Sequence, residues 1–212
     1  MRGSWTRRSV AAGLLALSVW GARPGSPAAA EGVVVALGDS LTAGYGVAQD
    51  EAWPALVNAQ LRQEGYAYRV VNAGVSGDTT AGGLRRVDWA LRAGPEVTIV
   101  ALGANDGLRG LPLDPMRANL VALVERLSAR GVRVLLAGMR LPPNYGDEYS
   151  RAFAAVFPGV AREEGVALMP FLLDGVAGDA RLNQADGIHP NAAGHRVIAA
   201  RVWPYLRPLL RR

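Results

Sequence analysis

The sequence contains no cysteine and no lysine, and it has only two histidines, His189 and His195, among 212 residues. Without cysteine no disulfide can stabilise the fold, so the packing of the core must do so, and a thiol nucleophile is excluded. Two histidines are too few for a histidine-rich catalytic zinc site. Chemistry must therefore come from hydroxyl nucleophiles or carboxylates, and we expect neither a metal ion nor another cofactor.

Residues 1–30 have the layout of a secretory signal peptide. A basic start precedes an apolar run over 10–20, and a small-residue stretch ends at Ala30. This run of eleven residues is well short of the roughly 20 needed to cross a bilayer, so we expect cleavage after Ala30 and no stable membrane anchor. An arginine pair in the basic start leaves the Sec and twin-arginine routes both open. The mature domain, residues 31–212, is thus expected to be periplasmic or secreted.

Removal of this segment changes the charge of the chain. The full sequence has 23 basic and 18 acidic residues and a net charge of +5, but four of the arginines and none of the acids lie in residues 1–30. The mature chain is then 19 minus 18, or +1. It has no run of basic residues interleaved with aromatics to follow a phosphate backbone, so nucleic-acid binding is not expected.

After residue 30, short apolar segments alternate with longer segments of helical periodicity. The pattern predicts five strands, at 33–37, 69–73, 97–102, 132–137 and 166–171. It predicts five helices, at 53–64, 79–92, 114–130, 148–164 and 192–206. Three of the strands are almost wholly apolar, which is typical of parallel strands covered on both faces. We expect one α/β domain, a three-layer α/β/α sandwich with a five-stranded parallel sheet, whose ligands bind at the carboxyl ends of the strands.

The first predicted strand runs into Gly38-Asp39-Ser40, which places a serine at a strand-to-helix turn. The glycine lets another backbone or a substrate approach closely. Ser40 is therefore the candidate nucleophile, although the segment alone is equally compatible with Asp39 or Ser40 only capping the next helix.

The second and third predicted strands also end in glycine-rich loops. The loop around Gly77 can point backbone amides into a cleft, and the Asn105 side chain can donate to a developing oxyanion. Taken alone, each segment fits an ordinary glycine turn better. Ser76 is disfavoured as a nucleophile because its surroundings lack the G-x-S-x-G spacing, which also disfavours an ordinary α/β-hydrolase.

A carboxylate and a histidine stand three residues apart in Asp186-Gly187-Ile188-His189. In a tight loop, such a carboxylate can hold the imidazole in one tautomer and stabilise its protonated form, which suits a base that activates a serine. His195 lies inside the next helical pattern, and we interpret it as structural.

Together these segments resemble the SGNH, or GDSL, hydrolase superfamily. Its four blocks occur in order as Gly38-Asp39-Ser40, Gly77, Gly103-x-Asn105-Asp106 and Asp186-x-x-His189. Further similarity over nearly all of the mature chain points to the bacterial branch that contains thioesterase I/lysophospholipase L1 and arylesterases. The resemblance implies a flavodoxin-like SGNH hydrolase fold.

The resemblance also implies roles for individual residues. Ser40 would attack the acyl carbonyl, His189 would take and return its proton, and Asp186 would orient His189. The Ser40 amide, the Gly77 amide and the Asn105 side chain would hold the oxyanion.

The resemblance carries two weaker implications, one about the wall that meets the acyl chain and one about a mobile stretch. Leu141 and Pro142 would contact the acyl chain, and the glycine-rich stretch 74–83 would be mobile and close over it. The expected substrates are small acyl esters, acyl thioesters or lysophospholipids, cleaved by a monomeric enzyme. The alternatives are a carbohydrate O-deacetylase of the same superfamily, a non-catalytic binding module, or a flavodoxin-like nucleotide binder, for which the sequence has no phosphate-binding motif.

Overall fold

The structure is a computed structural model that describes residues 1, 3 and 31–212. The signal peptide predicted over residues 1–30, with its cleavage site after Ala30, therefore falls almost wholly outside the described residues. Within the described part, no helix has the length and apolar character needed to cross a membrane.

Five parallel strands form a single sheet in the order β2-β1-β3-β4-β5. Their bounds are β1 Gly32–Gly38, β2 Tyr68–Gly74, β3 Val97–Ala101, β4 Arg133–Ala137 and β5 Ala167–Met169. All seven residues of β1 and all five of β3 are buried, because helices cover both faces of the sheet. The predicted α/β sandwich with a five-stranded parallel sheet is confirmed.

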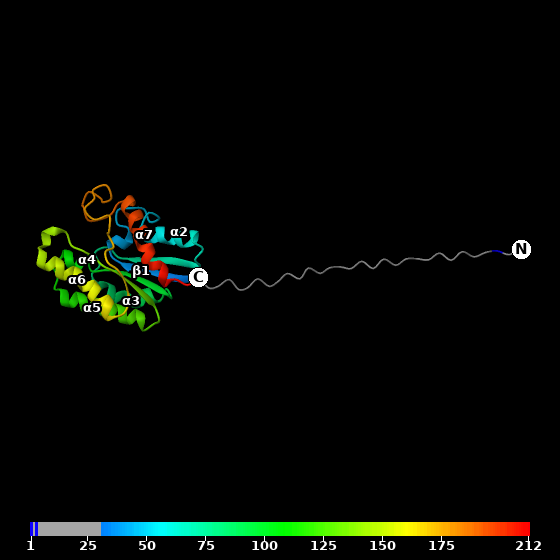
Figure 1. The fold of residues 1–212 in the computed structure, drawn as a ribbon, viewed down its shortest axis with the longest axis horizontal. Coiled ribbons are helices and arrows are strands. Elements are labelled where there is room, and N and C mark those ends of the chain that lie inside the picture. The colour runs from blue at the N-terminus through cyan, green and yellow to red at the C-terminus, as the bar shows by residue number, and fades with distance from the viewer. Residues whose placement is uncertain (2, 4–30) are drawn as a thin grey trace.

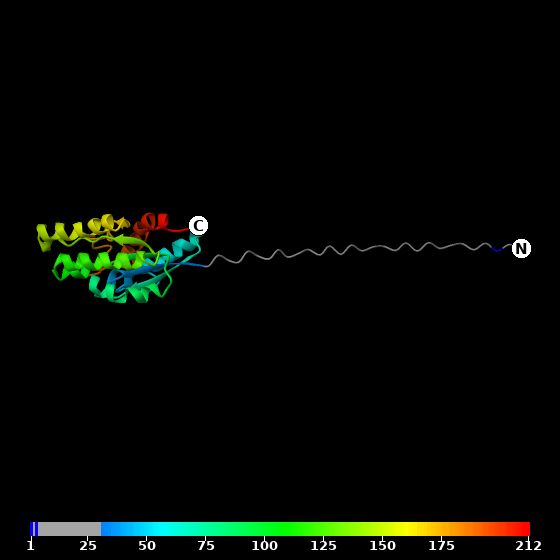
Figure 2. The same cartoon turned by 90° about the horizontal axis from the view of Figure 1, so that it is seen from below.

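Five long helices make the outer layers of the sandwich (Figures 1 and 2). They are α2 Trp53–Gln63, α3 Thr80–Leu91, α5 Leu113–Ser128, α6 Asp147–Glu163 and α7 Ala192–Leu206. Helices α2 and α7 pack against each other, while α5 packs between α3 and α6. Two short 3₁₀ turns lie next to these helices: Pro143–Tyr145 precedes α6, and Arg207–Leu209 follows α7.

The structure contains two short helices that the sequence did not predict, α1 Ser40–Ala43 and α4 Ala104–Leu108. Helices of four and five residues are too short to display a helical repeat. Both begin within three residues of a strand end, so α1 and α4 turn directly out of the carboxyl edge of the sheet. The predicted helix at 79–92 is found as α3, so Thr80 to Gly83, which the resemblance placed in a mobile stretch over 74–83, form the first turn of that helix.

The end of β2 packs directly against α1 at Gly74. A Cβ atom on Gly74 would overlap the backbone of Thr42 and Ala43. Backbone atoms cannot move aside as the end of a flexible side chain can, so Gly74 fixes how closely β2 approaches the helix that begins at Ser40.

We therefore expect Gly74→Ala to lower the free energy of unfolding by about 1 to 3 kcal/mol, the usual cost of overpacking. Gly159→Ala is the matched control, because Gly159 lies within α6 with no atom near its Cβ position. There, alanine should stabilise the helix by up to about 1 kcal/mol. Urea unfolding of both variants checks this, and an unchanged midpoint for Gly74→Ala would contradict the packing argument.

Candidate active site

Ser40 is the first residue of α1, immediately after the buried strand β1. Asp39 is the N-cap, and its Oδ1 accepts a hydrogen bond of 3.0 Å from the Leu41 amide. Asp39 therefore caps the helix, as one reading of the sequence proposed. The cap does not use the Ser40 hydroxyl, which is left available for other partners.

A continuous chain of hydrogen bonds links Ser40, His189 and Asp186. The distance from His189 Nε2 to Ser40 Oγ is 3.0 Å, and the distance from His189 Nδ1 to Asp186 Oδ2 is 2.7 Å. The serine and the histidine are 149 positions apart in the sequence. A serine hydroxyl, an imidazole and a carboxylate are thus within hydrogen-bond reach of one another, the geometry that an activated serine nucleophile requires.

The Asp186 carboxylate also organises its own loop. Its Oδ1 accepts hydrogen bonds from the backbone amides of Ile188 and His189, at 3.1 and 3.0 Å. The hydrogen bond from the His189 ring, followed by that from the His189 amide, lowers the pKa of Asp186 to about 2. The carboxylate therefore remains ionised at neutral pH, and it accepts from Nδ1 and leaves Nε2 facing Ser40.

Gln184 connects the histidine loop to the serine segment. Its backbone amide donates to the His189 carbonyl at 2.7 Å, and its side-chain Nε2 donates to the carbonyls of Tyr45 and Pro190 at 2.7 and 2.9 Å. The Tyr45 ring lies 4.7 Å from the His189 ring, centroid to centroid. Sequence reasoning missed Gln184 and Tyr45, because neither stands in a recognisable motif.

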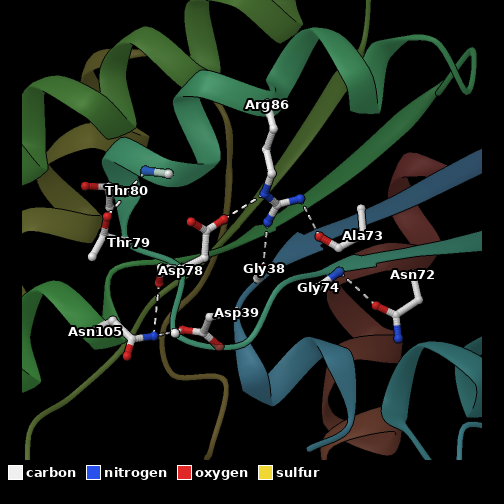
Figure 3. A network of polar contacts seen from close by, with 12 residues as sticks. Gly38, Asp39, Asn72, Ala73, Gly74, Asp78, Thr79, Thr80, Arg86 and Asn105 are labelled. Atoms are coloured by element: carbon white, nitrogen blue, oxygen red, sulfur yellow. Dashed lines mark hydrogen bonds and ion pairs between the residues drawn. The ribbon is translucent and has the colours of Figure 1, made fainter.

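Asn105 faces the same site from α4, its side chain fixed by two acceptors (Figure 3). Its Nδ2 donates to the Asp78 carbonyl at 3.0 Å and makes a longer contact of 3.4 Å with Asp39 Oδ2. Asp78, which sequence reasoning did not single out, thus sets the orientation of this amide.

Gly77 lies in the turn before Asp78 and has a φ of +78°, a conformation that favours glycine. Its carbonyl accepts a hydrogen bond of 2.8 Å from Arg109 Nη2. The cavity that contains Ser40, Asn105 and His189 is not lined by Gly77. The structure therefore brings five of the predicted site residues to one cavity and leaves Gly77 in the neighbouring turn: the five are Ser40, Asn105, Leu141, Pro142 and His189.

The cavity has a volume of about 430 Å³, within the usual range for small-molecule sites. Leu141 and Pro142, the two predicted acyl-chain contacts, both line it. Its wall is mainly apolar and includes Leu108, Met139, Leu141, Pro142, Pro143, Phe171, Leu173, Ala177 and Ile188. Such a wall suits an acyl chain better than a sugar. Within residues 31–212, no three acidic or histidine side chains converge in a way that would ligate a metal ion.

The remaining candidates from the sequence lie outside the cavity. His195 is 1% exposed, its Nδ1 accepts from the Trp53 amide at 3.2 Å, and burial lowers its pKa to about 4. The structural interpretation of His195 is confirmed. Ser76 is exposed in the turn before Gly77 and does not line the cavity.

Residues 36–197 match the GDSL-like Lipase/Acylhydrolase family, which is more than half of the chain. The chain belongs to this family. Its fold and its class of activity, the hydrolysis of carboxylic esters, follow from that membership, and the resemblance stated from the sequence is confirmed.

Individual members of the family are similar over most of their length. Esterase TesA from Pseudomonas aeruginosa is 45% identical over 86% of this chain and 91% of that protein. Thioesterase 1/protease 1/lysophospholipase L1 from Escherichia coli (strain K12) is 40% identical over 86% of this chain and 87% of its own. A crystal structure of TesA superposes with a TM-score of 0.82 at 45% identity, covering 84% of this chain and 99% of the other.

The buried Asp39 carboxyl is expected to make the stability of the fold depend on pH. Asp39 is 1% exposed, and burial raises its pKa from 3.8 to about 6. At a pH between the ordinary pKa and the raised pKa, the folded chain binds more protons than the unfolded chain. The free energy of unfolding therefore falls as the pH rises through this range. This rise in the pKa of Asp39 corresponds to about 3 kcal/mol of the free energy of unfolding, which is lost by pH 7.

Asp39→Asn should remove this loss, because an amide oxygen can still accept from the Leu41 amide and carries no charge to bury. We expect the variant to gain stability over the natural chain as pH rises from about 4 to about 7. Thermal unfolding of both proteins across this range measures the difference. Parallel curves for the two proteins would show that Asp39 is not the titrating group.

Proposed function

We propose that the chain is a serine esterase that cleaves carboxylic esters and thioesters through an acyl-enzyme formed on Ser40. The observation that carries the proposal is the hydrogen-bonded series Ser40–His189–Asp186 beside a mainly apolar cavity. A binding module would have no need of a serine hydroxyl held 3.0 Å from an imidazole that a carboxylate orients.

The first half of the reaction forms the acyl-enzyme. Ser40 Oγ attacks the acyl carbonyl while its proton passes to His189 Nε2. The oxyanion accepts hydrogen bonds from the Ser40 amide and the Asn105 side chain, while Gly77, whose amide the resemblance adds as a third donor, lies in the neighbouring turn. The tetrahedral intermediate collapses, and the leaving alcohol or thiol departs with the proton from His189.

The second half releases the acid. His189 takes a proton from water, and the resulting hydroxide attacks the acyl carbonyl on Ser40. The oxyanion re-forms in the same place, and its collapse returns the proton to Ser40 Oγ. Asp186 remains ionised throughout, holding the imidazole in position and stabilising its cationic form.

The proposed substrates carry an acyl chain that fits the apolar wall, on an alcohol, a thiol or a lysophospholipid backbone. A carbohydrate O-deacetylase is the second candidate, and the apolar residues Leu141, Pro142 and Phe171 weigh against it because an acetyl group would leave most of this wall unfilled. The basic and apolar start of the sequence supports export to the periplasm or beyond as the place of action.

Ser40→Ala should lower kcat by roughly 10⁴-fold or more, because neither the base nor the orienting carboxylate can act without the nucleophile. Ser76→Ala is the matched control and should keep near-normal turnover, since Ser76 lies outside the cavity. A fluorophosphonate should label the natural chain at Ser40 and fail to label Ser40→Ala. Labelling at Ser76, or full activity of Ser40→Ala, would refute the assignment.

Acyl-chain length separates the two candidate functions. With p-nitrophenyl esters, we expect kcat/KM to rise about fourfold per added methylene, from about 0.8 kcal/mol per buried CH₂, until the cavity is filled. An acyl thioester and a lysophosphatidylcholine of the preferred length should also be hydrolysed. If acetate proves the best acyl group and longer chains are rejected, the deacetylase is the better description.

A further inference from the structure

Arg86, in the middle of α3, uses all three nitrogens of its guanidinium in hydrogen bonds (Figure 3) and does not line the cavity. Its Nε pairs with Asp78 Oδ2 at 2.7 Å, its Nη1 donates to the Ala73 carbonyl at 2.6 Å, and its Nη2 donates to the Gly38 carbonyl at 2.7 Å. The side chain is 18% exposed. Charge-assisted hydrogen bonds of this length, partly shielded from water, are stronger than those of a surface ion pair.

The two carbonyls lie at the carboxyl ends of neighbouring strands. Gly38 ends β1 and precedes Asp39 and the nucleophile Ser40, while Ala73 is the penultimate residue of β2 and precedes the loop that contains Gly77. The Gly38 carbonyl also accepts from the Val75 amide at 3.0 Å. Arg86 therefore fixes the start of the Gly77 loop relative to the strand that presents Ser40.

The third acceptor, Asp78, connects Arg86 to Asn105. Asp78 pairs with Arg86 through its side chain and accepts from Asn105 Nδ2 through its backbone carbonyl, at 3.0 Å. A Cβ atom on Gly82 would overlap the Asp78 carboxylate, so glycine at this position leaves the room that the carboxylate occupies over α3. Gly82, one of the glycines that the resemblance placed in a mobile stretch, thus leaves space for the carboxylate of this ion pair.

The Asn105 amide nitrogen donates to the Asp78 carbonyl at 3.0 Å. Its second contact, with Asp39 Oδ2, is 3.4 Å long and lies beyond the usual hydrogen-bond range. An oxyanion can replace this weak contact, provided that Asp78 keeps the amide in its present orientation. The position of Asp78 is therefore a condition for the role proposed for Asn105.

We propose that Arg86 is a positioning residue for the oxyanion hole, acting through Asp78 on the orientation of the Asn105 side chain. The proposal rests on the function proposed above for Asn105. The alternative is that Arg86 only joins the ends of β1 and β2 and contributes to stability alone.

Arg133 provides a matched control in the same sheet. It is the first residue of β4, at the amino ends of the strands and away from the cavity. Its side chain is 36% exposed and pairs with Glu96 at 3.1 Å. Arg133→Gln removes an arginine–carboxylate ion pair that is more exposed than the Arg86–Asp78 pair. It should lower the melting temperature and leave kcat within about twofold, since a surface-proximal pair contributes chiefly to stability.

The test is a double-mutant cycle between Arg86→Gln and Asn105→Ala, with kcat, KM and thermal unfolding measured on each preparation. Asn105→Ala alone should lower kcat by about 10²- to 10³-fold. Arg86→Gln alone should lower kcat about 10- to 100-fold with KM within about twofold, because a displaced donor acts only in the transition state. In the Asn105→Ala background, the same arginine change should cost less than about threefold.

Two further variants test the same role in case Arg86→Gln does not fold. Arg86→Lys keeps the charge but lacks the planar fork whose three nitrogens reach three separate acceptors, so it should recover part of the kcat. Asp78→Asn keeps the backbone carbonyl and removes the ion pair. It should also lower kcat with little change in KM, but by less than Arg86→Gln does.

The outcomes are distinct. If Arg86→Gln and Asp78→Asn lower kcat equally with and without the Asn105 side chain, or only lower the melting temperature, the positioning role is refuted while the proposed function stands. If Asn105→Ala itself keeps full kcat, both the oxyanion role of Asn105 and the role of Arg86 are refuted. A non-additive loss confined to kcat supports the proposal.

Discussion

The parallel register of β1 with β2 and β3 is the constraint on which the candidate site depends. Gly38 is paired with Gly74 on one side and with Ala101 on the other, so three strands end at the same height. Each end leads within four residues to a part of the site, Ser40, Gly77 or Asn105. Since β1 and β3 are buried on both faces, a slip of one residue would exchange those faces, and the packing of the core therefore holds the register.

His189 is positioned in a different way, because it lies on a loop between β5 and α7 that no strand supports. Hydrogen bonds replace the sheet there: Asp186 accepts two amides of its own loop, and Gln184 joins that loop to the Tyr45 carbonyl. The site thus has a part fixed by the sheet and a part fixed by the loop. The Ser40–His189 hydrogen bond and the Gln184–Tyr45 hydrogen bond join these two parts.

The sequence predicted the elements with strong local signals. Buried parallel strands and long amphipathic helices were found to within a few residues, and the spacing of Asp186 and His189 is local enough to read directly. The residues that went unnoticed act over long distances or in very short elements. Arg86 contacts Gly38 across 48 positions, and no repeat or spacing in the sequence connects the two.

The glycines after β2 illustrate a different limit of sequence reasoning. The resemblance to the family placed Gly82 and Gly83 in a mobile stretch, although the helical pattern over 79–92 also included them. In the structure both are buried in α3, where a Cβ atom would overlap Asp78 in one case and the Leu102 side chain in the other. Glycine serves flexibility and close packing alike, and only the neighbouring atoms reveal which of the two applies.

The buried Asp39 carboxylate links the stability of the fold to the chemistry of the site. Helix α1 has four residues, too few to be stable without its cap, and Asp39 supplies that cap by accepting from the Leu41 amide. The amide of Ser40, as the first residue of the helix, has no carbonyl within the helix to donate to. A carbonyl oxygen bonded to Ser40 Oγ would lie beside this amide. A short capped helix directly after a buried strand thus presents both the proposed nucleophile and the backbone amide proposed as a donor to the oxyanion, at the cost of burying a carboxylate whose pKa rises to about 6.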